Sequence, residues 1–223
     1  MEDRRAYRSV TRDEQARRTR AEVVRAASEL FAGRGYAGTT MRQVAEAAGV
    51  SVPLVEQLFG TKANLLKSCI DVAIAGDDEP LAMLERDWTV AAEAATDVRG
   101  LIDVIVGVVV PAQARSATLI VAVFEGSRTD RELGDLAVRL DDQRLTMARW
   151  AVDRLVRIRP LREGTTRRDA VDTVWLLLDP TIYERLAHGR RRAPTFYRRW
   201  LANAIDRLLF DTHAPRARTR RRS

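Results

Sequence analysis

The chain has 223 residues, 31% of them charged, with a formal net charge of +7 and a sequence pI of about 10.4. This balance favours a polyanionic partner, either nucleic acid or an anionic membrane surface. The single cysteine, Cys69, excludes an internal disulfide and a metal site built on cysteines. The amino terminus lacks the apolar stretch of a signal peptide, so we expect a cytoplasmic protein.

Residues 1–16 are polar and basic and have no apolar stripe, which predicts a flexible arm. From Arg17 apolar residues recur at helical spacing, so a helix is expected there, and Gly33 and Gly35 are expected to end it. An arm of this kind can reach into a DNA minor groove, and the alternative is a solvated basic segment.

Two short helices around a tight turn are predicted between Thr40 and Phe59. Thr40 is placed to cap the first helix and Ser51 to cap the second, which has Pro53 in its first turn. Gly49 supplies the backbone freedom that the turn needs. This layout is a helix-turn-helix, in which the second helix enters a DNA major groove.

A further helix is expected from Lys62 to Ala75, with Cys69 buried on its apolar side. The run Gly76-Asp-Asp-Glu-Pro80 is a break, and we place a domain boundary there. The rest is also expected to be helical, which makes the fold class all-α, in segments over residues 81–95, 97–110, 112–125, 130–159, 168–188 and 194–211.

Two stretches of this second part leave alternatives open. Residues 104–110 are rich in β-branched side chains, so a strand is the second interpretation there. The apolar run from Leu101 to Val110 is too short to span a bilayer, and we expect a buried helix and no membrane partner. The basic tail, residues 213–223, is predicted to be disordered.

Recognisable runs follow one another from Phe31: Phe-Ala-Gly-Arg-Gly-Tyr-Ala-Gly-Thr-Thr, then Val44-Ala-x-x-Ala-Gly-Val-Ser51, then Phe59-Gly-Thr-Lys-x-x-Leu-Leu66. Together they resemble the DNA-binding domain of the TetR family of transcriptional regulators. The resemblance implies a helix-turn-helix domain over residues 17–76. It also implies a helical domain over residues 77–212 that binds a small effector and forms a homodimer. The segment from Trp175 to Tyr183 is similar to the penultimate helix of many members.

The resemblance also implies which residues contact DNA: Thr40, Ser51, Val52, Pro53, Leu54, Glu56, Gln57 and Lys62. These positions are suited to phosphate, because free N–H groups at helix amino termini and the lysine ammonium can donate hydrogen bonds to phosphate oxygens. Glu56 and Leu58 depart from the family pattern, which commonly has Tyr and His there. A carboxylate at Glu56 should repel the DNA backbone unless it pairs with a nearby arginine or reaches a cytosine amino group.

The second domain is expected to hold an apolar or aromatic effector between its helices. Candidate lining residues are Trp88, Ile105, Gln113, Phe124 and Trp150, with Arg115 and Glu125 as further candidates; the alternative for each is an ordinary place in the core. By resemblance, two apolar helix faces pair with their copies through Val171, Val174, Trp175, Leu178, Tyr197, Trp200, Leu201, Ala204 and Leu208. The alternative is that both faces are buried within one subunit.

These patterns predict a sequence-specific DNA-binding regulator, expected to be a repressor that a small effector releases from a palindromic operator. Catalysis, a cofactor and a metal are not expected. His188 and His213 are the only histidines, and no nucleophile–base or metal-ligand arrangement is recognisable. The alternative function is a DNA-binding or architectural protein that responds to no ligand.

Overall fold

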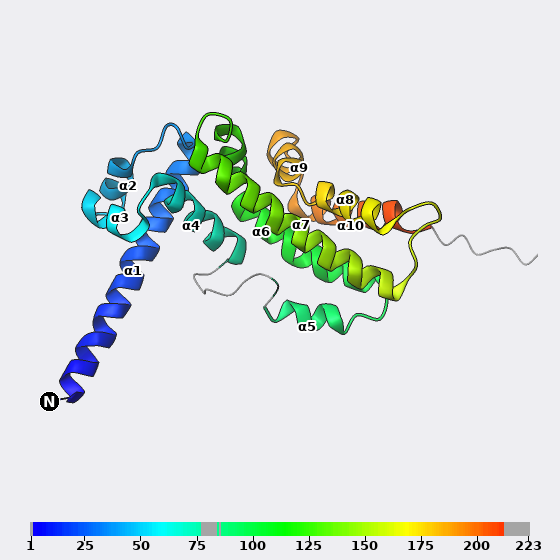
Figure 1. Cartoon of the computed structure of the whole chain (residues 1–223), viewed down its shortest axis with the longest axis horizontal. Helices are drawn as coiled ribbons and strands as arrows, with labels where there is room; N and C mark the ends of the chain where they lie inside the picture. The colour runs from blue at the N-terminus through cyan, green and yellow to red at the C-terminus, as the bar shows by residue number, and fades with distance from the viewer. Residues whose placement is uncertain (1, 77–83, 85, 212–223) are drawn as a thin grey trace, which may run out of the picture.

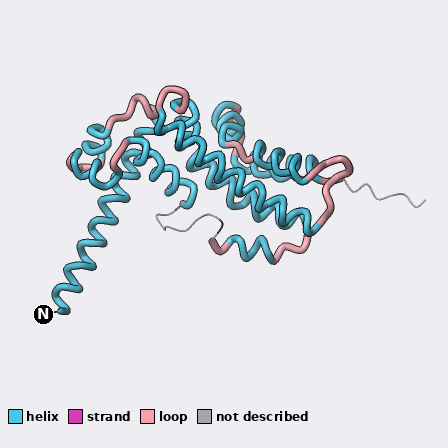
Figure 2. Tube along the Cα trace, viewed as in Figure 1, coloured by secondary structure: helices cyan, strands magenta, loops and turns pink. Residues whose placement is uncertain are grey.

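The computed structural model describes residues 2–76, 84 and 86–211, and this part of the chain is helical without a strand (Figures 1 and 2). The all-α prediction is confirmed, and the strand alternative for residues 104–110 is wrong. The predicted break at residues 77–80 and the basic tail at 213–223 lie outside the described residues.

The amino-terminal head consists of α1 (Glu2–Arg34), α2 (Met41–Ala47), α3 (Val52–Phe59) and α4 (Lys62–Ala75). Helix α1 starts at Glu2 rather than near Arg17, so residues 2–16 are helical where the sequence predicts a flexible arm. The stretch contains no glycine or proline and is rich in arginine, glutamate and alanine, which extend a helix readily once packing has nucleated it.

The body is built on α5 (Trp88–Glu93), α6 (Val98–Gly126) and α7 (Arg131–Ile158). Helix α6 is continuous through Pro111, where the sequence predicts two helices over 97–110 and 112–125. An internal proline costs about 3 kcal/mol. Helix α6 buries side chains along its whole length, and each large apolar one contributes about 1.5–3 kcal/mol, so packing outweighs the proline.

The apolar character of α6 follows from its central position. Its length and composition alone would allow it to cross a membrane, and 56% of its most apolar window is buried within the protein. Helices α4, α7, α9 and α10 all pack against it. Its apolar residues are therefore explained by a helix that is surrounded on most sides.

The chain ends in α8 (Arg167–Leu177), α9 (Pro180–Tyr183), the π-helical turn η2 (Glu184–Gly189) and α10 (Pro194–Leu209). The predicted helix over 168–188 is interrupted at Asp179-Pro180, as expected of a proline at this place. The Asp179 carboxylate accepts a hydrogen bond from the Thr181 amide at 2.7 Å and caps the new turn.

The apolar core has two parts that meet in α6 and α7. One part joins α6 and α7 to α8 and α10. The other joins the head helices to the far ends of α6 and α7, through Leu119, Ile120, Val123, Leu133, Leu136 and Leu140. The head therefore shares its core with α6 and α7. Because the core is close-packed, a displacement of α6 or α7 shifts the side chains of the head.

Candidate functional site

The turn between α2 and α3 is closed by local hydrogen bonds that the sequence specifies. The Thr40 hydroxyl accepts from the Gln43 amide at 3.2 Å, and the Gln43 side chain accepts from the Thr40 amide at 2.9 Å, which completes a capping box. Gly49 has φ 67°, a backbone conformation that suits glycine. Ser51 caps α3 through the Leu54 amide at 3.4 Å.

Helix α3 has one buried face and one exposed face. Val55 and Phe59 are buried against α1, α2 and α4. Pro53, Glu56 and Gln57 are exposed together on the opposite side, at the i, i+3, i+4 spacing that defines one helix face. This exposed face is the surface that a helix-turn-helix offers to a major groove.

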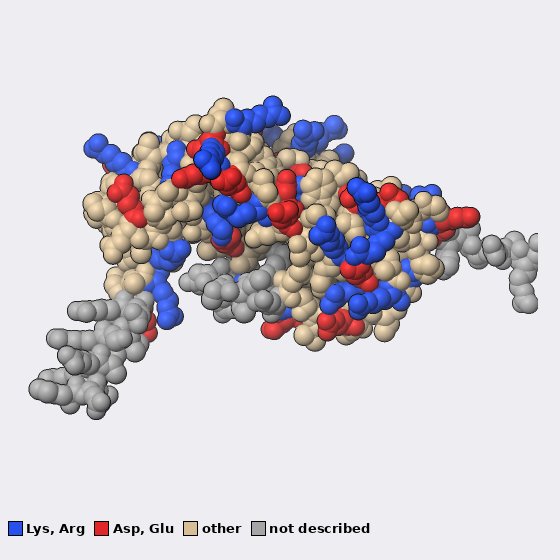
Figure 3. Space-filling view, viewed as in Figure 1, with Lys and Arg blue, Asp and Glu red and all other residues tan. Residues whose placement is uncertain are grey.

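Net positive charge is not gathered into one broad patch on the side of the molecule drawn in Figure 3. Basic and acidic side chains are interspersed there over the head and over α7.

Lys62, at the first position of α4, links this helix to the loop before α2. Its ammonium donates to the carbonyl oxygens of Tyr36 and Thr39, both at 3.0 Å, and lies 4.0 Å from the centre of the Tyr36 ring. Lysine has three N–H donors, so one remains for another acceptor. The side chain thus fixes the loop before α2 and still carries a charge beside it.

The same loop is packed against the turn between α6 and α7. Burial raises the pKa of Tyr36 to about 12, and the carboxylates of Asp130 and Glu132 contribute to the rise. Tyr36 therefore keeps its proton at neutral pH. The contact places the start of α7 against the head beside Lys62.

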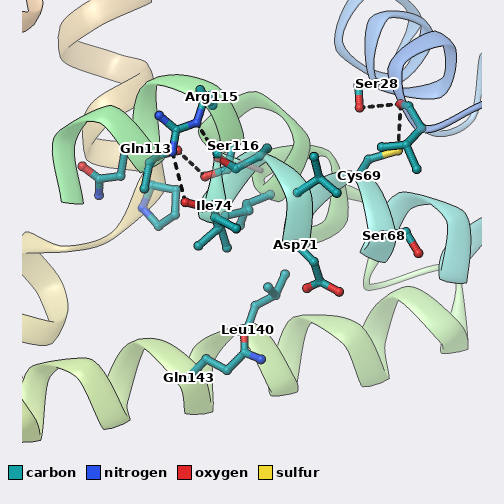
Figure 4. Close-up of a pocket in the computed structure, with 18 of the residues that line it drawn as sticks. Ser28, Ser68, Cys69, Asp71, Ile74, Gln113, Arg115, Ser116, Leu140 and Gln143 are labelled. Atoms are coloured by element: carbon teal, nitrogen blue, oxygen red, sulfur yellow. Dashed lines mark hydrogen bonds between the residues drawn. The ribbon is translucent and has the colours of Figure 1, made fainter. Parts of the chain in front are cut away.

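A cavity of about 1300 Å³ lies between α1 and α4 of the head and α6 and α7 of the body. Its apolar walls include Val72 and Ile74 from α4, Ile120 and Phe124 from α6, and Met147 from α7. Figure 4 shows Leu140 reaching from α7 toward α4, with Asp71 and Gln143 nearby. The size suits a small organic molecule.

Arg115 crosses from α6 to the carboxyl end of α4 at this cavity. Its Nε donates to the Ala73 carbonyl oxygen at 2.7 Å and its Nη2 to the Ile74 carbonyl oxygen at 3.1 Å (Figure 4). These are carbonyl groups that the last turn of a helix leaves unpaired. Helix α4 ends there at Gly76, which has φ 87°.

Residues 23–69 match the model of bacterial regulatory proteins of the tetR family. The chain is also 40% identical over 58 residues to the HTH-type transcriptional regulator TtgR and to the probable HTH-type transcriptional regulator ArpR, both of Pseudomonas putida. The head of this chain therefore resembles that of bacterial regulatory proteins of the tetR family. The aligned segment makes up 26% of this chain and spans 28% of the length of each of these relatives.

The fold of most of the chain is similar to that of solved transcriptional regulators. NalD of Pseudomonas aeruginosa, the secondary repressor of the MexAB-OprM multidrug efflux pump, superposes with a TM-score of 0.65 at 22% identity, covering 87% of this chain and 98% of NalD. FadR of Bacillus subtilis, solved with stearoyl-CoA, gives 0.64 at 15% identity, covering 83% and 96%. A regulator of Saccharomonospora viridis, solved with choline, gives 0.63 at 16% identity, covering 86% and 98%.

The residues expected to contact DNA fall into two groups in the head. Pro53, Glu56 and Gln57 form the exposed face of α3, and Val52 and Leu54 lie beside it, Val52 half-buried. The side chains of Thr40, Ser51 and Lys62 lie at helix starts and already take part in hydrogen bonds within the head. None of the described residues pairs with the Glu56 carboxylate, so the arginine partner considered for it is not present there.

The expected effector residues are not gathered in one place. Phe124 and Gln113 line the cavity, whereas Trp88, Trp150 and Ile105 do not. Trp88 and Trp150 pack edge to face with ring centroids 4.9 Å apart, and Ile105 is buried in the body core. Ile105 therefore has the core position considered as its alternative, and Trp88 and Trp150 are half-buried against that core.

Gln113 and the further candidates also differ from expectation in detail. The Gln113 amide donates to the carbonyl oxygen of Leu178, which also lines the cavity, at 2.9 Å. Glu125 does not line the cavity, but Arg115 does. Cys69 lines it too, and burial raises the pKa of its thiol to about 11, which keeps the group protonated and unreactive.

The expected dimer residues also divide into two groups. Val171, Val174, Leu178, Tyr197 and Leu201 are buried within the single chain, which is the alternative considered for them. Trp175, Trp200, Ala204 and Leu208 stay partly or fully exposed. Leu176, which the sequence analysis missed, is 55% exposed and joins them. The apolar pattern alone does not tell which side of a helix meets its own core and which is left outside.

Sequence analysis also missed the part of the cavity that belongs to the head. Its α1 and α4 walls include Arg17, Arg20, Ser28, Ser68 and Val72. These positions belong to a polar face or to a helix side that looks like ordinary core in the sequence. No pattern within one helix signals a cavity that four helices enclose.

Proposed function

We propose that this protein is a transcriptional regulator that binds operator DNA as a homodimer, with α3 in the major groove, and that a small apolar or aromatic effector in the cavity releases it. The DNA-binding part rests on the exposed face of Pro53, Glu56 and Gln57 on α3. The effector part rests on the cavity between head and body. A repressor role follows the family pattern, and we propose no catalytic activity.

The position of the cavity is the observation that carries the regulatory part. Helix α4 forms one of its walls and begins at Lys62, beside the helix-turn-helix. A ligand that pushes α4 away from α6 and α7 would tilt the head, and in a dimer it would change the spacing of the two α3 helices. Half-sites of a palindromic operator demand one fixed spacing, so such a change weakens binding.

Ligands of structural neighbours support an effector. FadR of Bacillus subtilis was solved with stearoyl-CoA and the regulator of Saccharomonospora viridis with choline. Their chemical difference indicates that this fold accepts unlike molecules. The residues of this chain's own cavity therefore have to identify its ligand.

The test starts from DNA fragments upstream of the gene for this protein and of its neighbours. Fluorescence anisotropy should show a fragment that binds at least about a hundredfold more tightly than random competitor at the same salt concentration. Compounds that raise the melting temperature should weaken that binding, because coupling between two sites is reciprocal. Absence of any preferred fragment contradicts the proposal, and stabilising compounds without effect on DNA affinity favour the ligand-independent alternative.

A further inference from the structure

Among the described residues that line the cavity, more arginines than carboxylates lack an oppositely charged partner. Of its carboxylates, Glu29 pairs with Arg25 at 3.2 Å and Asp71 pairs with Lys67. Asp142 is the one lining carboxylate without a cationic partner among the described residues. The acidic groups are therefore largely neutralised by their own helices.

Several lining arginines, by contrast, have no carboxylate partner in the described part of the chain: Arg17, Arg20 and Arg115. Arg20 is committed to the head, because it donates to the Leu58 carbonyl oxygen at 3.0 Å and lies 4.4 Å from the centre of the Phe59 ring. Arg115 is bonded only to neutral carbonyl groups. Among the described lining residues, unpaired positive charge is thus in excess, and it lies on exposed arginines at the rim of the cavity, which favours an anion.

Arg115 is prepared to receive that anion. Its two bonds to α4 use two of the five guanidinium N–H groups and leave three. The same bonds hold the side chain in one conformation, so an incoming carboxylate does not have to immobilise it. A carboxylate on the remaining N–H groups would form charge-assisted hydrogen bonds, which are about twice as strong as neutral ones.

The space beside Arg115 is long and apolar. Between Ser68 and Gly76 the cavity follows α4 for roughly 12 Å, at about 1.5 Å per residue. The opposite walls come from α6 and α7 and are largely aliphatic, including Val109, Ile120, Leu140 and Met147. The apolar part of a ligand would lose no hydrogen bonds there, and its transfer from water would favour binding.

We infer that the ligand of this cavity is an elongated apolar carboxylate, with its acidic group on Arg115 and its body along α4. The inference rests on the proposed function and specifies its effector. Because Arg115 holds the carboxyl end of α4, the ligand is attached to the helix whose other end carries Lys62 at the head. Charge at one end and apolar volume along the rest are both needed for binding.

Calorimetry on the full-length chain tests this without DNA. Dodecanoate, palmitate and phenylbutyrate serve as acidic probes, and dodecanol is the neutral match for dodecanoate. At least one acid should bind, and if it is dodecanoate it should bind about tenfold or more tightly than dodecanol. Arg115→Gln should weaken acid binding about tenfold and leave dodecanol unchanged. Arg185→Gln, on η2 outside the cavity, is the matched control and should change neither.

Three outcomes would overturn the inference. They are the failure of all three acids to bind, equal affinity for dodecanoate and dodecanol, and loss of acid binding in Arg17→Gln but not in Arg115→Gln. A circular-dichroism melt of each variant confirms that it is folded. DNA binding is measured separately: a protein that binds a preferred fragment but none of the acids contradicts this inference alone. A protein that binds acids through Arg115 but prefers no fragment contradicts the proposed function alone.

Discussion

Gly76 serves two purposes at the junction of head and cavity. Its φ of 87° lets α4 end in a left-handed cap, and a Cβ there would lie 3.0 Å from Arg115 Nη2. Gly76→Ala should therefore lower the free energy of unfolding by about 1–2 kcal/mol from backbone strain, and it should also disturb Arg115. Urea denaturation measures the first effect and acid binding the second.

Gly33 is the matched control for this substitution. It lies in the last turn of α1 at negative φ, and a Cβ there would meet nothing within 4 Å. Gly33→Ala should leave stability unchanged or raise it by about 0.5–1 kcal/mol, because alanine is the better helix former. Equal effects of the two substitutions would show that neither the cap nor Arg115 constrains position 76.

Glu56 places a negative charge on the exposed face of α3, and no described cation neutralises it. Glu56→Gln should tighten binding to the preferred DNA fragment by roughly 1 kcal/mol, about fivefold, because it removes repulsion from the phosphates. Anisotropy titrations at one fixed salt concentration measure the change. Glu163→Gln, at an exposed site between α7 and α8, should have no effect.

An unchanged affinity in Glu56→Gln would remove this side chain from the interface. A weaker affinity would instead mean that the carboxylate accepts a hydrogen bond from a base edge, such as the amino group of cytosine. Titration against fragments with single base changes would locate that base pair.

At the scale of whole elements, Lys62 joins α4 to the loop before α2. Lys62→Met should lower the free energy of unfolding by about 1–3 kcal/mol, because the carbonyl groups of Tyr36 and Thr39 lose their shared donor. Lys67→Met on the same helix removes only an exposed i, i+4 pair with Asp71 and should cost at most about 0.5 kcal/mol. Urea denaturation compares the two.

The same pair separates structure from DNA contact. If Lys62→Met left stability intact but abolished DNA binding, Lys62 would contact a DNA phosphate, and its bonds within the head would not contribute to stability. If it weakened both, the loop that it holds is part of the interface. Lys67→Met should leave DNA affinity close to that of the parent protein at the same salt concentration.

At the scale of the molecule, the body leaves an apolar surface on α8 and α10 uncovered. Leu176 and Leu208 are 55% and 48% exposed, and half-buried Trp175, Trp200 and Ala204 belong to the same two helices. A second copy would cover such a face about a two-fold axis. Leu208→Glu should therefore give a folded monomer in sedimentation equilibrium at micromolar concentration, where the parent chain is expected to be a dimer.

Two variants give this prediction its controls. Val138→Glu, at an exposed site on α7, should leave the dimer intact, and Leu201→Glu, inside the body core, should unfold the protein. A parent chain that sediments as a monomer would contradict the dimer. A Leu208→Glu chain that remains dimeric would place the interface on another face.

The sequence by itself determined the features that depend on near neighbours in the chain. Capping residues Thr40 and Ser51 and the turn at Gly49 are where the pattern predicts them. Each is decided by bonds within three or four residues, or by the backbone preference of a single residue. The family resemblance and the all-α fold follow from the same local signals.

Only the tertiary structure decided the rest. The continuity of α6 through Pro111, the buried sides of α8 and α10, and the cavity with Arg115 at the end of α4 depend on helices far apart in sequence. An apolar stripe predicts that a helix face is buried. It does not predict whether the same chain, a second copy or a ligand covers that face. That choice is made by packing among several helices, which no single helix encodes.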